Sequence, residues 1–147
     1  MSRTGAGLAL LLLGGYRSLV DAATAELASR GHPDFRPVHE FALRAIAAGA
    51  DSASELGRRT SVSKQAAAKT IAVLLERAYV VSAPDPGDGR RKRLELTSRG
   101  VDVMAQGEAI LDDARKKWEA QIGPTELANL EANLRALVGD AAVSDNG

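Results

Sequence analysis

The chain has 147 residues, which suits one domain, and 45% of them are hydrophobic while only 3% are aromatic. The core must therefore be built from aliphatic side chains. The absence of cysteine excludes a disulfide framework, a zinc site with cysteine ligands and thiol-based sensing within this chain. Two histidines, His32 and His39, are too few to indicate a metal site, and we expect no cofactor.

The formal net charge of zero hides an uneven distribution of charge. Residues 57–99 contain ten Lys or Arg and four Asp or Glu, and the rest of the chain has the opposite imbalance. A basic middle between acidic ends indicates a surface for a polyanion, although random scatter of surface charge is the alternative interpretation.

The N-terminal region predicts a helix over residues 7–30. Apolar side chains recur there at helical spacing: Leu8, Leu12, Tyr16, Leu19, Ala23 and Leu27. Arg3 and the apolar run 8–13 resemble a signal peptide, but polar residues and glycines at 14–17 interrupt the run, so we expect no secretion. Because the run is far shorter than a bilayer requires, we expect a cytoplasmic protein with no membrane partner.

Three helices are expected in the middle of the chain. The first covers residues 37–48, with Pro37 at its first position and a buried face made of Val38, Phe41, Ala45 and Ile46. The second is short and starts at the capping-box pattern Ser52-Ala-Ser-Glu55, with Leu56 as its inward anchor. After a turn at 59–62, Ser63 can cap the third helix, which extends to about residue 77.

The two faces of that third helix differ in chemistry. Its apolar face consists of Ala67, Ile71, Leu74 and Leu75. Its other face consists of Lys64, Gln65, Ala68, Lys69 and Ala72. A hairpin should follow, from strands at 79–81 and 94–96 around the turn cluster at 85–89.

Two further helices should complete the chain. Thr97 can cap a long helix through about residue 121, with one apolar stripe made of Val101, Met104, Leu111, Trp118 and Ile122. A last helix follows Gly123-Pro124, with the stripe Leu127, Leu130, Leu134 and Leu137. The expected fold is mainly α with a small β-hairpin, in one domain of residues 1–147.

A short helix, a turn, a helix and a hairpin together indicate a winged helix-turn-helix, whose second helix enters the major groove of DNA. Ser61, Ser63, Lys64 and Gln65 lie at the start of that helix. Glutamine can pair with adenine edges, lysine with guanine or phosphate, and hydroxyls with phosphate oxygens. The alanines at 66–68 keep the helix slim enough to approach the bases.

The hairpin carries the basic run Arg90, Arg91, Lys92 and Arg93. Strand alternation sends Arg91 and Arg93 to one face and Arg90 and Lys92 to the other, and Asp88 is expected to pair with Arg90. Beside a reading helix, such a run can enter the minor groove or bind its phosphates. The alternative is a charged edge that blocks strand pairing.

These segments resemble the MarR family of bacterial regulators. The most specific part is Asp85-x-x-Asp88-x-Arg90 followed by Leu94-x-Leu96-Thr97-x-x-Gly100. The resemblance extends over nearly the whole chain, and it implies a homodimer that binds a near-palindromic operator. It also implies base or phosphate contacts by Ser63, Lys64, Gln65 and Lys69 and a wing contact by Arg90.

Three positions depart from the family pattern. Gly89 stands at the expected wing tip, where another arginine is common. This difference weakens the expected contact of the wing with the minor groove of DNA, or moves that contact to Arg91. Ala78 and Ser61 replace glycines that commonly end the reading helix and form the turn, so the geometry of those turns is open.

Leucines on the terminal helices indicate a dimer interface, because they would otherwise be exposed. They are Leu8, Leu12, Leu19, Leu127, Leu130, Leu134 and Leu137. We therefore expect residues 1–31 and 98–143 to be dimerisation helices and 34–97 to be the DNA-binding lobe, with two reading helices about 34 Å apart. A self-contained bundle is the alternative.

No catalytic set or phosphate loop is evident, so we expect no enzyme. The resemblance implies a small aromatic or phenolic ligand that lowers DNA affinity, and His39 and Trp118 are weak candidates to line its pocket. We predict a sequence-specific DNA-binding regulator, a repressor more often than an activator. The alternative is a winged protein-interaction module that has lost DNA binding.

Overall fold

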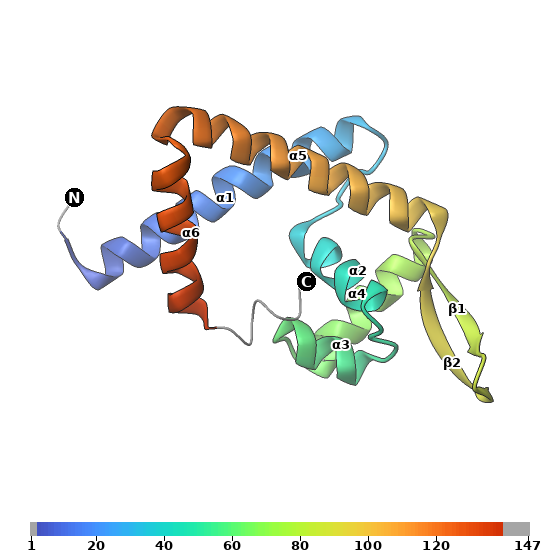
Figure 1. The fold of residues 1–147 in the computed structure, drawn as a ribbon. Coiled ribbons are helices and arrows are strands. Elements are labelled where there is room, and N and C mark those ends of the chain that lie inside the picture. Colours follow the sequence, from blue (N-terminus) through green and yellow to red (C-terminus); the bar gives the residue numbers. More distant parts are fainter. Residues whose placement is uncertain (1–2, 140–147) are drawn as a thin grey trace.

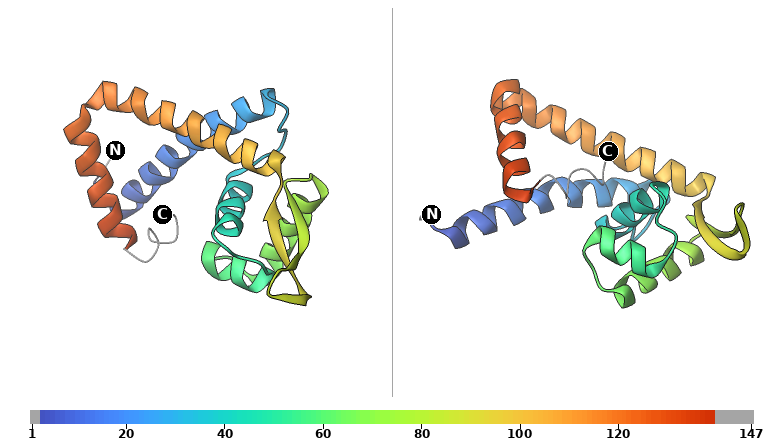
Figure 2. Two further views of the ribbon diagram at one scale, coloured as in Figure 1. Left: turned by 45° about the vertical axis from the view of Figure 1, so that its right-hand side comes forward. Right: turned by 60° about the horizontal axis from the view of Figure 1, so that its bottom comes forward.

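The computed structural model describes residues 3–139 of the chain. Its elements are α1 (Gly5–Ser29), α2 (Pro37–Ala47), α3 (Ala53–Thr60), α4 (Lys64–Glu76), β1 (Val80–Asp85), β2 (Asp88–Leu96), α5 (Ser98–Ile122) and α6 (Pro124–Val138). Figure 1 shows α5 crossing the molecule, with α2, α3, α4 and the hairpin at one end and α6 at the other. The further views in Figure 2 agree with this division, and the expected mainly helical fold with one hairpin is confirmed.

Three hydroxyl caps define where the helices of the lobe and the long helix begin. The side-chain oxygens of Ser52, Ser63 and Thr97 accept hydrogen bonds from backbone N–H groups three residues later, at 3.0–3.1 Å. Each cap satisfies a donor that the first helical turn leaves without a partner. The reciprocal half of the predicted capping box is absent from the described hydrogen bonds, because the Glu55 carboxylate pairs with Arg59 at 2.7 Å.

The buried face of α2 differs from the sequence prediction. Val38 and Phe41 are 45% and 46% exposed, whereas Ala42 and Leu43 are buried beside the correctly predicted Ala45 and Ile46. The reason is that α2 packs against α3, α4, β2 and α5 at once, which rotates its buried arc by about one residue. Val101 of α5 and Leu75 of α4 are likewise exposed within one chain.

Tyr79 joins the lobe to the long helix. Its hydroxyl lies 2.8 Å from His32 Nδ1, its ring packs edge-on against Phe35, and the Arg99 guanidinium lies over its face. Burial, followed by the charge of Arg99, lowers the pKa of His32, while Asp102 acts in the opposite direction. Tyr79 itself is among the largest fully buried side chains, so the core centres on this contact between segments distant in sequence.

Both positions where the sequence lacks an expected glycine keep the left-handed backbone. Ser61 has φ of 58° and Ala78 has φ of 62°, a region that disfavours residues with a Cβ atom. Ser61 ends α3 and its N–H donates to Gly57 O, while Ala78 separates the end of α4 from β1. The substitutions therefore leave strain in the turns and do not change the path of the chain.

We expect Ala78→Gly to stabilise the protein by about 0.5–1 kcal/mol. Relief of the left-handed strain raises the free energy of unfolding by about 1–2 kcal/mol. The greater freedom of glycine in the unfolded chain lowers it by about 0.4–1 kcal/mol. Urea unfolding followed by circular dichroism measures the difference. The control Ala72→Gly, at an exposed helical position of α4, should lose about 1 kcal/mol, and a loss of stability for Ala78→Gly would contradict the strain.

Helix α1 is longer than its apolar run. Among the described residues it is the one helix that is long and apolar enough to cross a membrane by length and composition, with a mean hydropathy of 1.3 over its best window. The predicted helix over residues 7–30 agrees with α1, and the apolar run 8–13, judged too short for a bilayer, is only part of it. The C-terminal half packs through the buried Ala23 and Leu27, so at least this half belongs to the protein core.

Candidate DNA-binding surface

Helices α3 and α4 form a tight helix-turn-helix whose turn requires a glycine. The N–H of Val62 donates to Gly57 O at 2.9 Å, and a Cβ atom built on Gly57 would lie 2.9 Å from the carbonyl oxygen of Val62. Gly57 therefore allows the chain to turn directly against α3. Leu56 and Ala67, both 1% exposed, anchor the two helices in the core.

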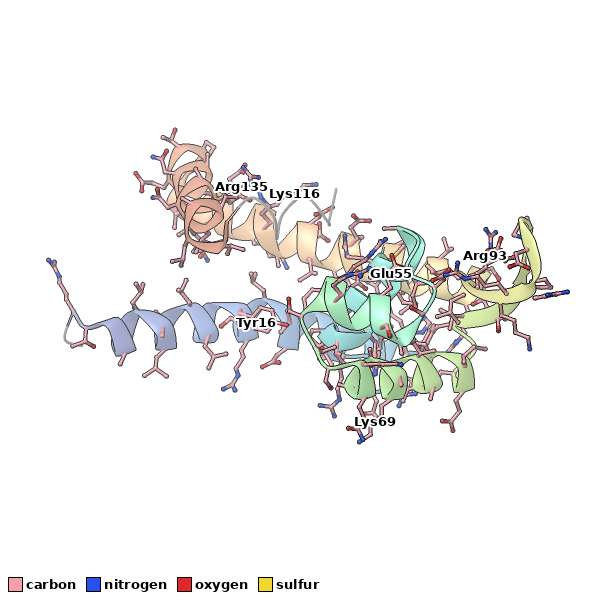
Figure 3. The ribbon with its side chains drawn as sticks, turned by 90° about the horizontal axis from the view of Figure 1, so that it is seen from below. Tyr16, Glu55, Lys69, Arg93, Lys116 and Arg135 are labelled. Carbon is pink, nitrogen blue, oxygen red and sulfur yellow. The ribbon has the colours of Figure 1, made fainter. Side chains whose placement is uncertain are left out.

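The N-terminal part of α4 presents a polar, exposed face. Ser61, Ser63, Lys64, Gln65 and Lys69 are all exposed. The Ser63 oxygen already accepts from Ala66 N, so its hydroxyl hydrogen remains available to donate. Figure 3 shows the Lys69 side chain pointing away from the body of the molecule, in the same half as Arg93 and remote from Lys116 and Arg135.

The hairpin next to α4 is longer than predicted. Strands β1 and β2 pair antiparallel from Val80–Leu96 to Pro84–Lys92, and then Asp85 pairs with Asp88. Gly89, Arg90 and Arg91 consequently have no partner in β1. The turn is Pro86-Gly87, with Asp85 Oδ1 accepting from Gly87 N at 2.9 Å, so Gly89 lies in this irregular part of β2 and not at the tip, contrary to the prediction.

Two of the four wing cations are paired within the chain. Arg91 lies 3.5 Å from Asp51, which precedes α3, and Arg93 lies 2.6 Å from Glu95 of the same strand. Arg90 and Lys92 are exposed and form no ion pair among the described residues. They are therefore the wing cations that can bind an anion without first losing a partner.

The expected ion pair between Asp88 and Arg90 is not present in the described structure. Asp88 Oδ1 instead accepts a hydrogen bond from the backbone N of Arg90 at 3.1 Å. A carboxylate two residues away reaches the main chain more easily than the end of an arginine side chain. Asp88 thus shapes the backbone and leaves the guanidinium of Arg90 exposed.

Sequence reasoning missed Asp51, the residue that ties the wing to the helix-turn-helix. It stands directly before the cap Ser52, where an acidic residue is ordinary, so no spacing signalled a partner forty residues later. Glu95, in contrast, could have been found, because residues i and i+2 of a strand share a face.

A pocket lies between the lobe and the terminal helices, but neither candidate lining residue belongs to it. It is lined by Val20, Ala23, Thr24, Leu27, Phe35, Arg36, Pro37, Glu40, Phe41, Gly107 and Leu111. Trp118 lies about two turns beyond Leu111 along α5, and His39 Nδ1 accepts a hydrogen bond from Arg36 N at 2.9 Å. His39 therefore stabilises the start of α2, and His39 and Trp118 do not line this pocket.

Glu40 is the charged residue that sequence reasoning overlooked in this pocket. It is 7% exposed, and its Oε1 accepts from Arg44 Nε at 3.0 Å. Its Oε2 is buried without a hydrogen-bond partner. Burial raises the pKa of Glu40, Arg44 lowers it and Glu108 adds a smaller upward effect.

We expect Glu40→Gln to be more stable than the natural protein at pH 8. Because the pKa of Glu40 is raised in the folded state, its contribution to stability is complete below the ordinary glutamate pKa of about 4.3 and falls as the pH rises through the folded value. Glutamine does not titrate, so the advantage should shrink near pH 4. Urea unfolding at both pH values tests this, and an equal advantage at both would contradict it.

The fold and the exposed basic face together define a winged helix-turn-helix protein. The MarR family model matches residues 39–91, which run from α2 into β2 and include the helix-turn-helix. No match is found among curated proteins.

Solved structures show the same fold at low sequence identity. The chain is similar to the reduced form of MarR from E. coli, with a TM-score of 0.71, 21% identity and coverage of 90% of this chain and 96% of that one. For a MarR-family regulator from Rhodococcus sp. RHA1 these values are 0.70, 18%, 95% and 99%. For the PcaV regulator from Streptomyces coelicolor, solved with its natural ligand, they are 0.68, 20%, 95% and 94%.

Proposed function

We propose that this protein is a cytoplasmic, homodimeric repressor that binds a near-palindromic operator in double-stranded DNA. The observation that carries the proposal is the exposed polar face at the start of α4. It stands beside a wing in which Arg90 and Lys92 form no ion pair with any described residue. Lys64 and Gln65 read bases from the major groove. Ser61, Ser63 and Lys69 bind phosphates around them.

In the wing, Arg90 and Lys92 bind the backbone or enter the minor groove. Arg91 and Arg93 act mainly by holding the wing in position, because Asp51 and Glu95 already pair with them. The wing thus positions the protein on DNA while α4 supplies most of the sequence discrimination.

Leucines at the two ends of the chain support the homodimer. Leu8 and Leu137 are 57% and 66% exposed, and Leu12 and Leu19 are also exposed, while Leu130 and Leu134 are half-buried. An apolar surface of this extent favours association over exposure to water. Leu127 differs, because it is buried inside the single chain and is not open surface. The dimerisation range 98–143 includes residues 140–143, and the range 1–31 includes residues 1–2, which lie outside the described part.

Sedimentation equilibrium tests the dimer directly. We expect a mass of twice one chain at micromolar concentration, since stable homodimers bury large apolar interfaces. The mass of a single chain under the same conditions would contradict the dimer. It would not affect the assignment of α4 as the reading helix.

A gel-shift assay with the DNA that flanks the protein's own gene tests operator binding. We expect a specific shift that weakens steeply as salt rises. A folded dimer that gives no shift at low salt would support the alternative, a winged protein-interaction module without DNA binding.

The difference between the ion-paired wing cations, Arg91 and Arg93, and the other two, Arg90 and Lys92, gives a further prediction. Arg90→Ala and Lys92→Ala should each reduce the slope of log affinity against log salt by about 0.9, the value for one lost phosphate contact. Arg93→Ala should change the slope less, because Glu95 already neutralises Arg93. Fluorescence anisotropy with operator DNA between about 50 and 200 mM salt measures all three, and equal slopes for the three variants would contradict the division.

Relief of repression by a small ligand completes the proposal. A ligand that binds more tightly to a dimer with wrongly spaced reading helices shifts the population away from DNA. The pocket supports this step by its position, because α1 and α5 of the proposed dimerisation region and α2 of the DNA-binding lobe all line it.

A further inference from the structure

A buried histidine lies where three segments of the chain meet. His32 is 4% exposed and belongs to the loop between α1 and α2. Its Nδ1 lies 2.8 Å from the hydroxyl oxygen of Tyr79, which stands between α4 and β1. Its Nε2 lies 3.9 Å from a carboxylate oxygen of Asp102 on α5. We call these three residues, together with Arg99 of α5, the His32 cluster. A change in the charge of the histidine ring acts on the lobe and the long helix at once.

The partners of Tyr79 determine which nitrogen of the neutral His32 ring carries the hydrogen. Among the described residues, the Tyr79 hydroxyl has two hydrogen-bond partners, His32 Nδ1 and Arg99 Nη2. An arginine can only donate, so the hydroxyl donates its own hydrogen to His32 Nδ1. This network of hydrogen bonds therefore assigns the ring hydrogen to Nε2, the nitrogen that faces Asp102.

Protonation of His32 removes the acceptor that the Tyr79 hydroxyl uses. Both nitrogens of a protonated ring are donors, so two hydrogens would point at each other along the 2.8 Å between Nδ1 and the hydroxyl oxygen. Tyr79 is 1% exposed, so its hydroxyl cannot turn to water, and a buried donor without an acceptor is costly. The contact between the loop, the lobe and α5 is thus at its strongest while His32 is neutral.

The environment of His32 keeps the ring neutral at pH 7.5. Burial lowers the pKa of His32, Arg99 lowers it further, and Asp102 acts in the opposite direction with a smaller effect. The Asp102 side chain is 62% exposed, so water screens its attraction for a protonated ring. Further charged residues of the loop and of the helices beside it have partners of their own: Arg30 with Glu26, Arg36 with Asp34, and Arg77 with the carbonyl oxygen of Asp34.

We propose that the His32 cluster is a pH-sensitive contact, in which protonation of the ring in mild acid loosens the lobe from α5 and releases the protein from DNA. Thr97, whose hydroxyl lies 3.1 Å from Tyr79 O, belongs to the same contact, so the change acts where the lobe is oriented on α5. The effect on DNA rests on the proposed function, whereas protonation of His32 does not require DNA. Its direction is diagnostic, because added positive charge alone would strengthen binding to a polyanion.

Fluorescence anisotropy with the DNA that flanks the protein's own gene, at pH 7.5 and pH 5.0 and one salt concentration, tests the effect on the full chain. We expect the natural protein to bind at least about tenfold more weakly at pH 5.0, the effect of one lost buried hydrogen bond. His32→Asn keeps an acceptor for Tyr79 and does not titrate, so its affinities at the two pH values should agree within about threefold. The matched control His39→Asn, which removes the other histidine, should retain the loss.

Two measurements without DNA test the protonation itself. An NMR titration of the histidine ring protons should give His32 a pKa below the ordinary value of about 6.5, and Asp102→Asn should lower it further. Because the folded pKa is lowered, the contribution of His32 to stability is present above that ordinary value and is lost as the pH falls below it. In urea, the natural protein should therefore lose stability relative to His32→Asn between pH 7.5 and pH 5.0.

Each other result overturns the proposal. Equal or tighter binding of DNA by the natural protein at pH 5.0 would show that the contact does not respond to acid, and a loss that His32→Asn retains would place the response elsewhere. A pKa of His32 at or above its ordinary value would contradict the donor assignment, even if His32→Asn failed to fold. Absence of DNA binding already at pH 7.5 would contradict the proposed function instead, and the titration and unfolding would still decide whether the His32 cluster responds to pH.

Discussion

The double variant Lys64→Ala with Gln65→Ala is expected to lower operator affinity by about 30- to 1,000-fold at about 100 mM salt. A good contact to a base edge contributes about 1–3 kcal/mol, and two such losses together reach about 2–4 kcal/mol, at about 1.4 kcal/mol per tenfold change. The fold should be unaffected, because both side chains are exposed. Fluorescence anisotropy with labelled operator measures the loss.

The matched control is Lys116→Ala with Gln121→Ala, which removes the same two residue types from exposed positions of α5. Lys116 lies in the half of the molecule opposite Lys69 (Figure 3). Its operator affinity should stay within about threefold of the natural protein, the effect of roughly 0.5 kcal/mol for a remote surface change. If both double variants lost affinity equally, or if neither did, α4 would not be the reading helix.

Among the described glycines, we expect Gly100→Ala to lower the free energy of unfolding the most. A Cβ atom on Gly100 would overlap the carbonyl oxygen of Tyr79, and this neighbour is backbone, which cannot rotate away. Overpacking of a core costs about 1–3 kcal/mol and occasionally more, and we expect a loss of about 3 kcal/mol. Urea unfolding monitored by circular dichroism gives the change in free energy.

Gly89→Ala is the control for that substitution. A Cβ on Gly89 meets no atom within 4 Å, so the change in stability should remain within about 0.5 kcal/mol. Similar stabilities for the two variants would mean that α5 does not approach Tyr79 as closely as the structure shows.

The elements that local sequence determines were predicted well. Ser52, Ser63 and Thr97 start their helices by capping interactions that span three residues, and Pro37 starts α2. The exposed face of α4 followed from helical spacing alone. Gly100 illustrates the limit of this reasoning, because the motif contained it but only the packing of α5 on Tyr79 explains why a glycine is required.

Contacts between segments that are far apart in the sequence could not be predicted. Arg91 pairs with Asp51 across forty residues, so one of the expected DNA-binding cations already has a carboxylate partner within the chain. Val38 and Phe41 were assigned to the core because an isolated helix has one apolar face, while four neighbouring elements decide which face of α2 is buried. Glu40 was overlooked for the same reason, since a single acidic residue in a helix usually faces water.

The hydroxyl of Thr97 is one of the contacts that join the lobe to the start of the long helix. It lies 2.6 Å from Ala78 O and 3.1 Å from Tyr79 O, and it also caps α5. In the proposed dimer, α5 is therefore a lever of about 37 Å, given 1.5 Å per residue, with its pivot beside both α4 and the wing. A rotation of about 5° at this pivot moves the far end by about 3 Å, close to the spacing of about 3.4 Å between successive bases along one strand. In the proposed dimer, a rotation that leaves the lobe and the long helix unchanged inside thus shifts one α4 against the other by about one base pair.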